Sequence, residues 1–431
     1  MALESLFQFL DAGVSRFHSA AHAAALLDRA GFRALEETAA WEDLQEGQGY
    51  YLTRNGSALA AFYYTGAPQG FRIIASHGDS PTFQVKAAFP PAGGMTRLEV
   101  ERYGGMIAPS WLDRPLTLAG RAMVAQGETL APRLVYLDRD LLIIPSLCPH
   151  FDREASLGRK LDPQADLQPL LGDDQAPALR ELVAGELEVE PQEILSLELT
   201  LTPRQKAVYL GAQKEFFAAP RIDDLECAWA SLEGFLAADP APGMVNLWVL
   251  LDNEEVGSST RQGACGTLVE DVMDRILLAA GAAGQDRYRI YANSMALSAD
   301  NGHAVHPNHP EKSDPLNSPK MNGGVLLKMN ASKRYTTDGI MEALLTRLAR
   351  EHDIPLQVFT NRGDIAGGST LGNLLQHRVS IPMADIGAAQ LAMHACVETA
   401  GAKDALWLEQ LCRTFYAAAV TCTGDGRYTL A

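Results

Sequence analysis

The chain has 431 residues, of which 47% are hydrophobic and 21% are charged. This length predicts about two to three domains, and the hydrophobic content excludes a globally disordered chain. The formal net charge of −17 argues against nucleic acid or an anionic membrane surface as the main partner.

The cysteines and the apolar runs indicate a cytoplasmic protein. None of the six cysteines lies in a CxxC pair, which favours a reducing compartment over a disulfide scaffold. Charged residues interrupt the apolar ones near the N-terminus, so we expect no signal peptide. Runs such as Val245–Leu251 are far shorter than the roughly 20 apolar residues that span a bilayer, so we expect no membrane span.

The N-terminal part is predicted to contain helices and then strands. Residues 1–40 are predicted to be helical, because apolar residues recur there at helical spacing. Two strand-like runs flank Asn55-Gly56, which is a hairpin signal. Ile73–Ala75 reads as a buried strand that enters a loop at His77.

A different pattern begins near residue 83 and ends near residue 210. Strand-sized runs alternate with Gly and Pro, and a polar, Pro-rich stretch covers Asp152–Pro191, with a helix-like piece around Leu179–Ala184. We therefore predict a β-rich domain over 84–210, inserted into a second domain that comprises 1–83 and 211–431.

The remainder of the chain alternates between helices and strands. This alternation predicts an α/β fold with a helix-covered, mostly parallel sheet. Arg287–Ala292 is predicted to be the element that leads into the loop at Asp300. The other predicted elements are helices at Asp223–Leu236, Cys265–Ala280, Thr337–Glu351, Ser369–Leu375 and Trp407–Cys422, and strands at Val245–Leu251, Leu356–Thr360 and Ile381–Ile386.

Carboxylates and imidazoles gather where these elements end, which is where α/β sheets bind ligands. Such side chains suit Zn²⁺, Mn²⁺ or Co²⁺. In an adjacent Glu pair, one side chain can bind a metal while the other serves as a general base. The candidates are His77, Asp223, Glu254, Glu255, Asp300 and His394.

Each of these patterns also has a plainer interpretation. Asn253-Glu254-Glu255 alone is more often a solvated turn. Asp79 can orient a metal-binding His77, although this spacing is weak evidence in isolation. His303, His306 and His309 are not predicted as metal ligands, because Gly302 and Pro307 break a helix; His303 or His306 can instead contact substrate.

Seven motifs together resemble the M18 aspartyl aminopeptidases, in the same order along the chain. They are SHGDSP (76–81), APRIDDL (219–225), DNEEVGSSTRQGA (252–264), SADNGHAVHPN (298–308), LKMNASKRYTTD (327–338), GDIAGGSTLG (363–372) and DIGAAQLAMHA (385–395). The resemblance implies a two-metal aminopeptidase with an α/β catalytic domain and an inserted dimerisation domain. It also implies dodecamers built from dimers.

The resemblance also assigns a role to each matching residue. His77 and Asp300 would bind one metal, and Glu255 and His394 would bind the second. Asp223 would bridge the two metals. Glu254 would be the general base, and Asp79 would orient His77. The Asp223–Asp224 peptide would be cis. Zinc is the expected ion.

Three further residues match positions that contact substrate in the family. Lys328 would meet the acidic side chain of the first substrate residue, and Tyr335 would lie near the same pocket. His150 would reach into the active site of a neighbouring subunit. Lys328 could alternatively be an ordinary solvated lysine, and His150 could alternatively be a plain interface residue.

The chain departs from the family pattern in three places. Gly78 replaces a threonine, Asp224 replaces an asparagine, and the segment 363–368 lacks a cysteine. The extra carboxylate at Asp224 can alter metal preference.

The expected function is removal of N-terminal residues, preferentially Asp or Glu, from peptides with a free α-amine. A peptidase or N-acyl deacylase that prefers neutral residues, and a scaffold without chemistry, are the alternatives.

Overall fold

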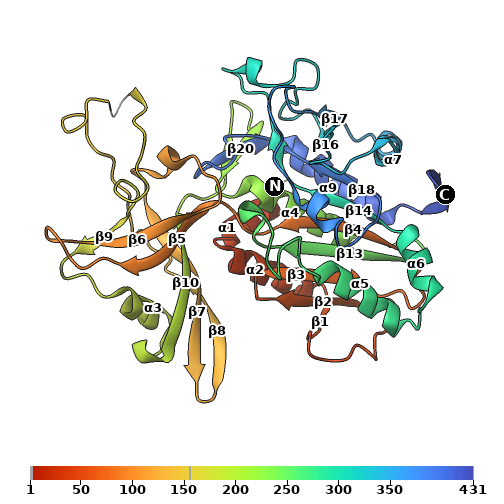
Figure 1. Cartoon of the computed structure of the whole chain (residues 1–431), viewed down its shortest axis with the longest axis horizontal. Coiled ribbons are helices and arrows are strands. Elements are labelled where there is room, and N and C mark those ends of the chain that lie inside the picture. The colour runs from red at the N-terminus through yellow and green to blue at the C-terminus, as the bar shows by residue number, and fades with distance from the viewer. Residues whose placement is uncertain (1–2, 155–156, 431) are drawn as a thin grey trace.

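The computed structural model describes residues 3–154 and 157–430. Residues 1–2 of the predicted helical segment and residues 155–156 of the polar stretch lie outside this description. Figure 1 shows a smaller sheet with helix α3 (Leu179–Leu187) on one side of the molecule and a larger, helix-covered sheet on the other.

The larger sheet contains nine strands of the described chain, in the order β1-β2-β3-β13-β4-β14-β18-β16-β17. Central strands β13, β4, β14 and β18 run parallel, whereas β3 and β16 pair antiparallel with their inner neighbours. The predicted α/β fold with a mostly parallel sheet is confirmed. The strands are β1 (Arg33–Ala34), β2 (Gly49–Arg54), β3 (Ala58–Tyr63), β4 (Gly70–His77), β13 (Met244–Leu251), β14 (Met295–Ala299), β16 (Val325–Lys328), β17 (Leu356–Phe359) and β18 (Met383–Gly387).

Helices cover both faces of this sheet. Along β13, Trp248 and Leu250 enter one core, and Leu247 and Val249 enter the other, because successive side chains of a strand point to opposite faces. The first core contains α1 (Glu4–Ala12), α2 (Arg16–Arg29), α4 (Ile222–Ala237), α7 (Gly339–Glu351) and α9 (Ala402–Ala417). The second contains α5 (Leu268–Ala279), α6 (Gln285–Ala292) and α8 (Leu371–Leu375).

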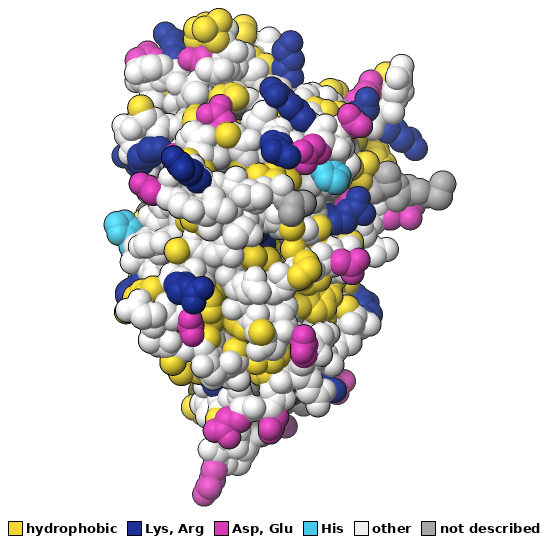
Figure 2. All heavy atoms as spheres, turned by 90° about the vertical axis from the view of Figure 1, so that its right-hand side faces the viewer, with side chains coloured by type: hydrophobic (Ala, Val, Ile, Leu, Met, Phe, Trp, Pro, Cys, Tyr) yellow, Lys and Arg dark blue, Asp and Glu magenta, His cyan; other side chains and the backbone are white. Residues whose placement is uncertain are grey.

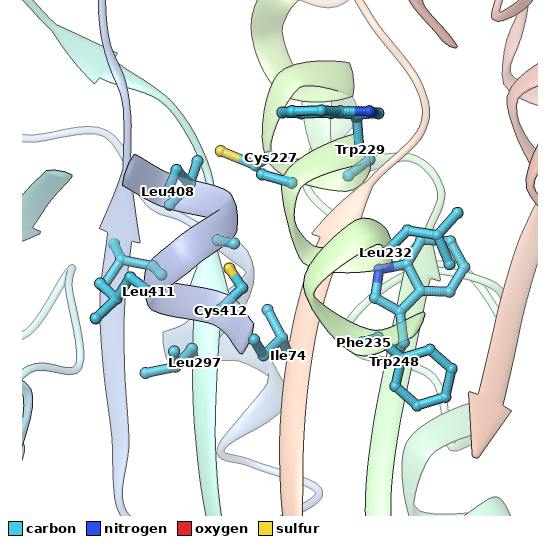
Figure 3. Packing of buried hydrophobic residues seen from close by; sticks show 14 of the residues in the cluster. Ile74, Cys227, Trp229, Leu232, Phe235, Trp248, Leu297, Leu408, Leu411 and Cys412 are labelled. Atoms are coloured by element: carbon cyan, nitrogen blue, oxygen red, sulfur yellow. The ribbon is translucent and has the colours of Figure 1, made fainter. Parts of the chain in front are cut away.

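Helices α4 and α9 pack side by side over β4 and β13 (Figure 3). Their close approach depends on Gly234, where a Cβ atom would lie 2.7 Å from the backbone nitrogen of Arg413 and 2.8 Å from Cys412 Cβ. Trp248 donates a hydrogen bond from its indole to Ser231 of α4 at 2.8 Å. This packing fixes the beginning of α4, where Asp223 lies.

The smaller sheet, which we call the inserted sheet, consists of β5 to β10 and lies in the chain between β4 and β13. It has its own core, which includes Phe83, Trp111 and Leu118. The predicted boundaries at 83/84 and 210/211 stay a prediction. Its strands are β5 (Thr82–Ala88), β6 (Met95–Tyr103), β7 (Leu116–Gln126), β8 (Thr129–Tyr136), β9 (Leu170–Asp173) and β10 (Ile194–Pro203).

Short elements complete the described chain. A five-stranded sheet has the order β11-β12-β20-β19-β15, and a two-stranded one pairs β21 with β22. Their bounds are β11 (Val208–Leu210), β12 (Phe216–Ala219), β15 (Gly302–His303), β19 (Ala389–Leu391), β20 (Glu398–Gly401), β21 (Val420–Gly424) and β22 (Arg427–Leu430). The 3-10 turns are η1 (Ala108–Trp111), η3 (Pro191–Glu193), η4 (Glu254–Val256) and η5 (Pro310–Lys312).

Three predicted elements need correction. The predicted helix over 1–40 does not continue beyond Arg29: Gly31 adopts φ of 85°, and Arg33–Ala34 then forms strand β1.

Arg287–Ala292 does not lead directly into Asp300: it belongs to helix α6, and strand β14 follows it. Arg287 and Tyr291 lie four residues apart on one helix face, and both bind Asp274 of α5. This tertiary contact favours a helix where the local pattern did not decide.

The last helix, α9, begins and ends five residues earlier than the predicted Trp407–Cys422. After Ala417 the chain becomes extended, because the buried Arg72 donates to the carbonyl of Val420 and Asn293 accepts from the backbone N–H of Cys422.

The described helices include none that is both long and apolar enough to cross a bilayer. On the face shown in Figure 2, basic and acidic side chains are interspersed among uncharged ones.

Charged residues hold the inserted sheet against the larger sheet. Arg16 of α2 binds Glu198 of β10 at 2.6 Å. Arg121 of β7 binds Glu198 at 2.8 Å and donates to the carbonyl oxygen of Asn55 at 2.6 Å. His18 of α2 lies at the same junction, with its ring edge-on to Tyr136 of β8.

This junction predicts a loss of stability at mildly acidic pH. Burial and the nearby Arg221 lower the pKa of His18 from 6.5 to about 4. As pH falls through 6.5, the unfolded chain binds a proton at His18 that the folded chain excludes. His18 therefore lowers the free energy of unfolding at pH 5 by about 2 kcal/mol relative to its value well above pH 6.5.

The His18→Gln variant should lose that part of the pH dependence. The measurement is urea unfolding at pH 7.5 and pH 5 of the wild type, of His18→Gln, and of His377→Gln, whose side chain is exposed. Identical pH dependence in all three proteins would contradict the assignment.

Candidate metal centre and active site

The candidate site lies at one edge of the larger sheet, where three adjacent parallel strands end. Strand β4 ends at His77, which pairs in register with Leu251 at the end of β13. Glu254 and Glu255 follow β13 in turn η4, and Asp300 follows β14. Because carboxyl ends of parallel strands meet at the same edge, residues far apart in the sequence come together.

A fourth segment, at the beginning of α4, adds two carboxylates. The Asp223–Asp224 peptide is cis, as the resemblance implies. Both side chains are buried, and the carboxylate of Asp224 accepts the backbone N–H of His77 at 3.1 Å. The carbonyl of Asp223 accepts from Ser80 Oγ at 3.0 Å.

The carboxylate of Asp223 lies between two imidazoles. Its Oδ1 is 3.4 Å from His77 Nε2, and its Oδ2 is 3.2 Å from His394 Nε2. His394 Nε2 is also 3.4 Å from Glu255 Oε2. The ligand atoms form three overlapping groups, each within 4.8 Å: His77, Asp223, Asp224 and Asp300; His77, Glu254 and Glu255; and Asp223, Glu255 and His394.

The residues present fit divalent cations. Asp223 Oδ1, Asp224 Oδ1 and Glu255 Oε1 are buried without a hydrogen-bond partner. A buried, unsatisfied carboxylate oxygen is costly, and a metal ion removes that cost. Oxygen and imidazole ligands without a thiolate suit Zn²⁺, Mn²⁺ or Co²⁺.

Electrostatics at the site reflect this excess of negative charge. Burial raises the pKa of Asp224 and of Glu255 well above the usual range, and neighbouring carboxylates raise both further. Burial also raises the pKa of Asp223, but the adjacent imidazoles of His394 and His77 outweigh it and lower that pKa. A cation in this position would stabilise all of these groups in their ionised forms.

Two further carboxylates hold the candidate ligands in place. Asp79 accepts the backbone N–H groups of Glu254 and Glu255, each at 3.2 Å, and its Oδ1 lies 3.4 Å from His77 Nδ1. His77 Nδ1 lies closer to the backbone carbonyl of Asp79, at 3.1 Å. Asp79 therefore anchors the two glutamates, and its role in orienting His77 stays a prediction.

Glu398 has a similar position but was missed from the sequence. It accepts the N–H of Asp223 at 3.0 Å and that of His394 at 2.6 Å. The signal for it in the sequence is its place four residues after His394, just beyond the motif DIGAAQLAMHA (385–395).

A pocket of about 330 Å³ opens beside these groups. His77, Asp223, Glu254, Asp300 and His394 line it, and so do Lys328 and Tyr335. Lys328, at the end of β16, is 2% exposed. Its Nζ donates to the carbonyl of Asn301 at 2.8 Å, lies 3.5 Å from Asp300 Oδ1, and is 5.5 Å from the Tyr335 ring centre.

The three histidines of the run lie close to the site. His303 lines this pocket, and His303, His306 and His309 all line an adjacent cavity of about 470 Å³. His150 is exposed and is not among the residues that line the pocket of its own chain, so its contact with a neighbouring subunit stays a prediction.

Comparison with known proteins identifies the family. Residues 9–416 match the model of the aminopeptidase I zinc metalloproteases (M18). A Clostridium novyi protein named "Probable M18 family aminopeptidase 2" is 36% identical over 427 residues, covering 95% of this chain and 97% of the relative. A Streptomyces coelicolor protein of the same name is 38% identical over 412 residues, covering 93% and 94%.

Solved structures agree with this result. Chaetomium thermophilum mApe1 superposes with a TM-score of 0.86 at 30% identity, covering 96% of each chain. The S. cerevesiae mApe1 dodecamer gives 0.83 at 29% identity, covering 96% of this chain and 95% of the other. The chain therefore belongs to the M18 family of zinc metalloproteases and is an aminopeptidase, a hydrolase of peptide bonds.

Proposed function

We propose that this aminopeptidase removes N-terminal residues, preferentially Asp or Glu, from peptides with a free α-amine, using two divalent ions. The observation that carries the proposal is the position of Asp223 between His77 and His394. His77 and Asp300 would hold one ion, Glu255 and His394 the other, and Asp223 would contact both. Zn²⁺ is the first choice because the family model is that of zinc metalloproteases, and Mn²⁺ or Co²⁺ also fit these ligands.

When bound, the ions would supply Lewis-acid polarisation of the scissile carbonyl and would lower the pKa of water. Glu254 would take the proton from the attacking water and deliver it to the leaving amine. Glu254 lines the pocket, which supports this role. Burial raises its pKa to about 8 in the absence of an ion, and cations beside it would lower that pKa so that the carboxylate can accept a proton. Asp79 would keep Glu254 in place through its backbone N–H.

Lys328 would select an acidic first residue. It is a buried ammonium group at the wall of the pocket, and a carboxylate in the pocket would make a charge-assisted hydrogen bond with it. Tyr335 lies beside it and would close the same side of the pocket.

One observation favours a second candidate, an aminopeptidase or deacylase that prefers neutral residues. The ammonium of Lys328 already binds the carbonyl of Asn301 and lies 3.5 Å from Asp300. If Lys328 serves only to hold the loop that carries Asp300 and Asn301, its ammonium would not be free to bind an acidic substrate.

We also propose that the chain assembles through the inserted sheet and its loops, as a dodecamer built from dimers. The loop that carries His150 exposes Leu147 at 43%, Phe151 at 83% and Leu157 at 82%, which favours burial against another chain. The S. cerevesiae relative was solved as a dodecamer. His150 would then stabilise the reacting carbonyl oxygen in the neighbouring subunit.

We propose a cytoplasmic location, because the cysteines are free thiols. Each of the six is unpaired in the described structure. A reducing compartment keeps such thiols free.

Metal titration tests the two-ion centre. Metal-free protein should bind two ions of Zn²⁺, Mn²⁺ or Co²⁺ per subunit in calorimetry, and each ion should stabilise the fold by about 2.7 kcal/mol at 100 times its dissociation constant. Asp223→Asn should weaken both binding events, because it would contact both ions. Asp364→Asn, an exposed acid paired with Arg362, is the control. A single binding event in the wild type would contradict the proposal.

A panel of aminoacyl reporters tests substrate preference. Asp, Glu, Leu, Ala and N-acetyl-Asp substrates would be compared with and without a chelator. Chelator-sensitive cleavage of Asp and Glu substrates is expected, with the acetylated substrate inert. Lys328→Met should reduce kcat/KM for Asp and Glu by about 10- to 150-fold and leave Leu and Ala within about 3-fold, because a charged hydrogen bond contributes about 1.5–3 kcal/mol.

Faster cleavage of Leu or Ala by the wild type would favour the second candidate. Cleavage of N-acetyl-Asp would point to a deacylase. A wild type that is inactive with every metal would leave only the scaffold alternative.

Mixed oligomers test the role of His150. Glu254→Gln and His150→Ala should each be nearly inactive alone. Subunits of the two variants, dissociated and reassembled together, should recover about a quarter of wild-type activity, since half of the dimers would be mixed and each would have one intact site. No recovery in verified mixed oligomers would show that His150 does not act across subunits.

A further inference from the structure

Tyr103, the last residue of β6 in the inserted sheet, reaches the back of the candidate site. Its hydroxyl donates to Asp79 Oδ2 at 2.7 Å and accepts from Asn253 Nδ2 at 2.8 Å. Tyr103 therefore binds residues from two loops of the larger sheet, one after β4 and one after β13.

Both partners of this hydroxyl control the backbone of the two glutamates. Asp79 accepts the N–H groups of Glu254 and Glu255. Asn253 directly precedes them in a left-handed conformation, with φ of 62°. Loss of the hydroxyl would release the acceptor of both N–H groups and the residue that begins the turn.

The side chain of Asn253 is held from its other end as well. Its Oδ1 accepts from Thr260 Oγ1 at 2.9 Å and from Gln262 Nε2 at 3.0 Å. These two donors require the oxygen on their side, so the amide NH₂ faces Tyr103.

Tyr103 itself is held in one position. The guanidinium of Arg16 lies 5.1 Å from its ring centre, 3.7 Å from Asp252 Oδ2 and 2.6 Å from Glu198 Oε1. Burial and the adjacent Asp79 raise the pKa of the Tyr103 hydroxyl, so it stays protonated and can donate.

The segment after Tyr103 continues across the site. Gly104 has φ of 76°, and a Cβ atom there would lie 3.1 Å from Glu255 Cβ. Two residues beyond Gly105, Ile107 donates its N–H to the carbonyl of His394 at 3.0 Å. The inserted sheet thus contacts the backbone or side chains of two candidate metal ligands.

We propose that Tyr103 is a positioning residue: its hydroxyl holds Asp79 and Asn253 so that Glu254 and Glu255 are oriented for proton transfer and metal binding. Because Tyr103 belongs to the inserted sheet, the glutamates are in position only when that sheet is docked on the larger one. The inference rests on the proposed function for the roles of Glu254 and Glu255.

The test is Tyr103→Phe, which keeps the ring beside Arg16 and removes only the hydroxyl. Its kcat for the best reporter substrate should fall by about 10- to 100-fold, the usual effect of removing a partner that orients a metal ligand. KM should stay within about 2-fold, because Tyr103 contacts no part of the pocket where Lys328 lies. Zn²⁺ titration of the metal-free variant should show one binding event weakened by a similar factor.

Amide hydrogen exchange of the metal-free protein gives a readout that does not depend on activity. The N–H groups of Glu254 and Glu255 should exchange faster in Tyr103→Phe than in the wild type. The matched control is Tyr51→Phe, which removes another Tyr–Asp hydrogen bond, from Tyr51 to Asp28 Oδ1 at 2.8 Å, in the larger sheet. It should leave kcat, Zn²⁺ affinity and exchange at the glutamates unchanged.

Asn253→Gly provides a second variant, since glycine adopts the positive φ while the side chain that bonds Tyr103, Thr260 and Gln262 is removed. In the double variant with Tyr103→Phe, the fold-loss in kcat should be much smaller than the product of the two single losses, because both substitutions remove the same Tyr103–Asn253 hydrogen bond. If Tyr103→Phe matches Tyr51→Phe in kcat, Zn²⁺ affinity and exchange, the inference is overturned. A wild type without metal-dependent peptidase activity would instead overturn the proposed function, and the exchange comparison would still decide the positioning role.

Discussion

Buried negative charge is the constraint on which the rest of this structure depends. Asp223, Asp224, Asp300 and Glu255 approach one another at an edge of the sheet, and three of their oxygens lack a hydrogen-bond partner. Such a cluster is tolerable when cations or protons neutralise it and when its geometry is held rigidly. The second requirement explains the many backbone N–H groups that are bound by carboxylates around the site.

Asp79 and Glu398 meet that requirement in the same way. Each places one carboxylate between two backbone N–H groups, Glu254 and Glu255 for Asp79, and Asp223 and His394 for Glu398. A carboxylate that spans two segments fixes their spacing more precisely than packing alone, because hydrogen bonds are directional. In this chain, two acids outside the proposed ligand set therefore hold candidate ligands in place.

The sequence predicted the architecture where a local pattern had one reading. The short apolar run at 245–251 favoured a buried strand and Asn55-Gly56 favoured a tight hairpin, and both appear as expected. Residues 287–292 had no such pattern, and a contact with Asp274 in another helix decided for a helix. The end of α9 similarly depends on the buried Arg72, 348 residues away in the chain.

The sequence by itself determined the fold class, the family and the set of candidate ligands, because motifs at strand ends retain their residue types and order. Only the tertiary structure decided which acids anchor the others. Tyr103 and Glu398 contact the site through hydrogen bonds to distant segments, and no spacing in the chain encodes those distances. It also decided that the segment ending the inserted sheet reaches the candidate site: Tyr103 binds Asp79 and Asn253, Gly104 lies beside Glu255, and Ile107 binds His394. These contacts exist only when the two sheets are packed together.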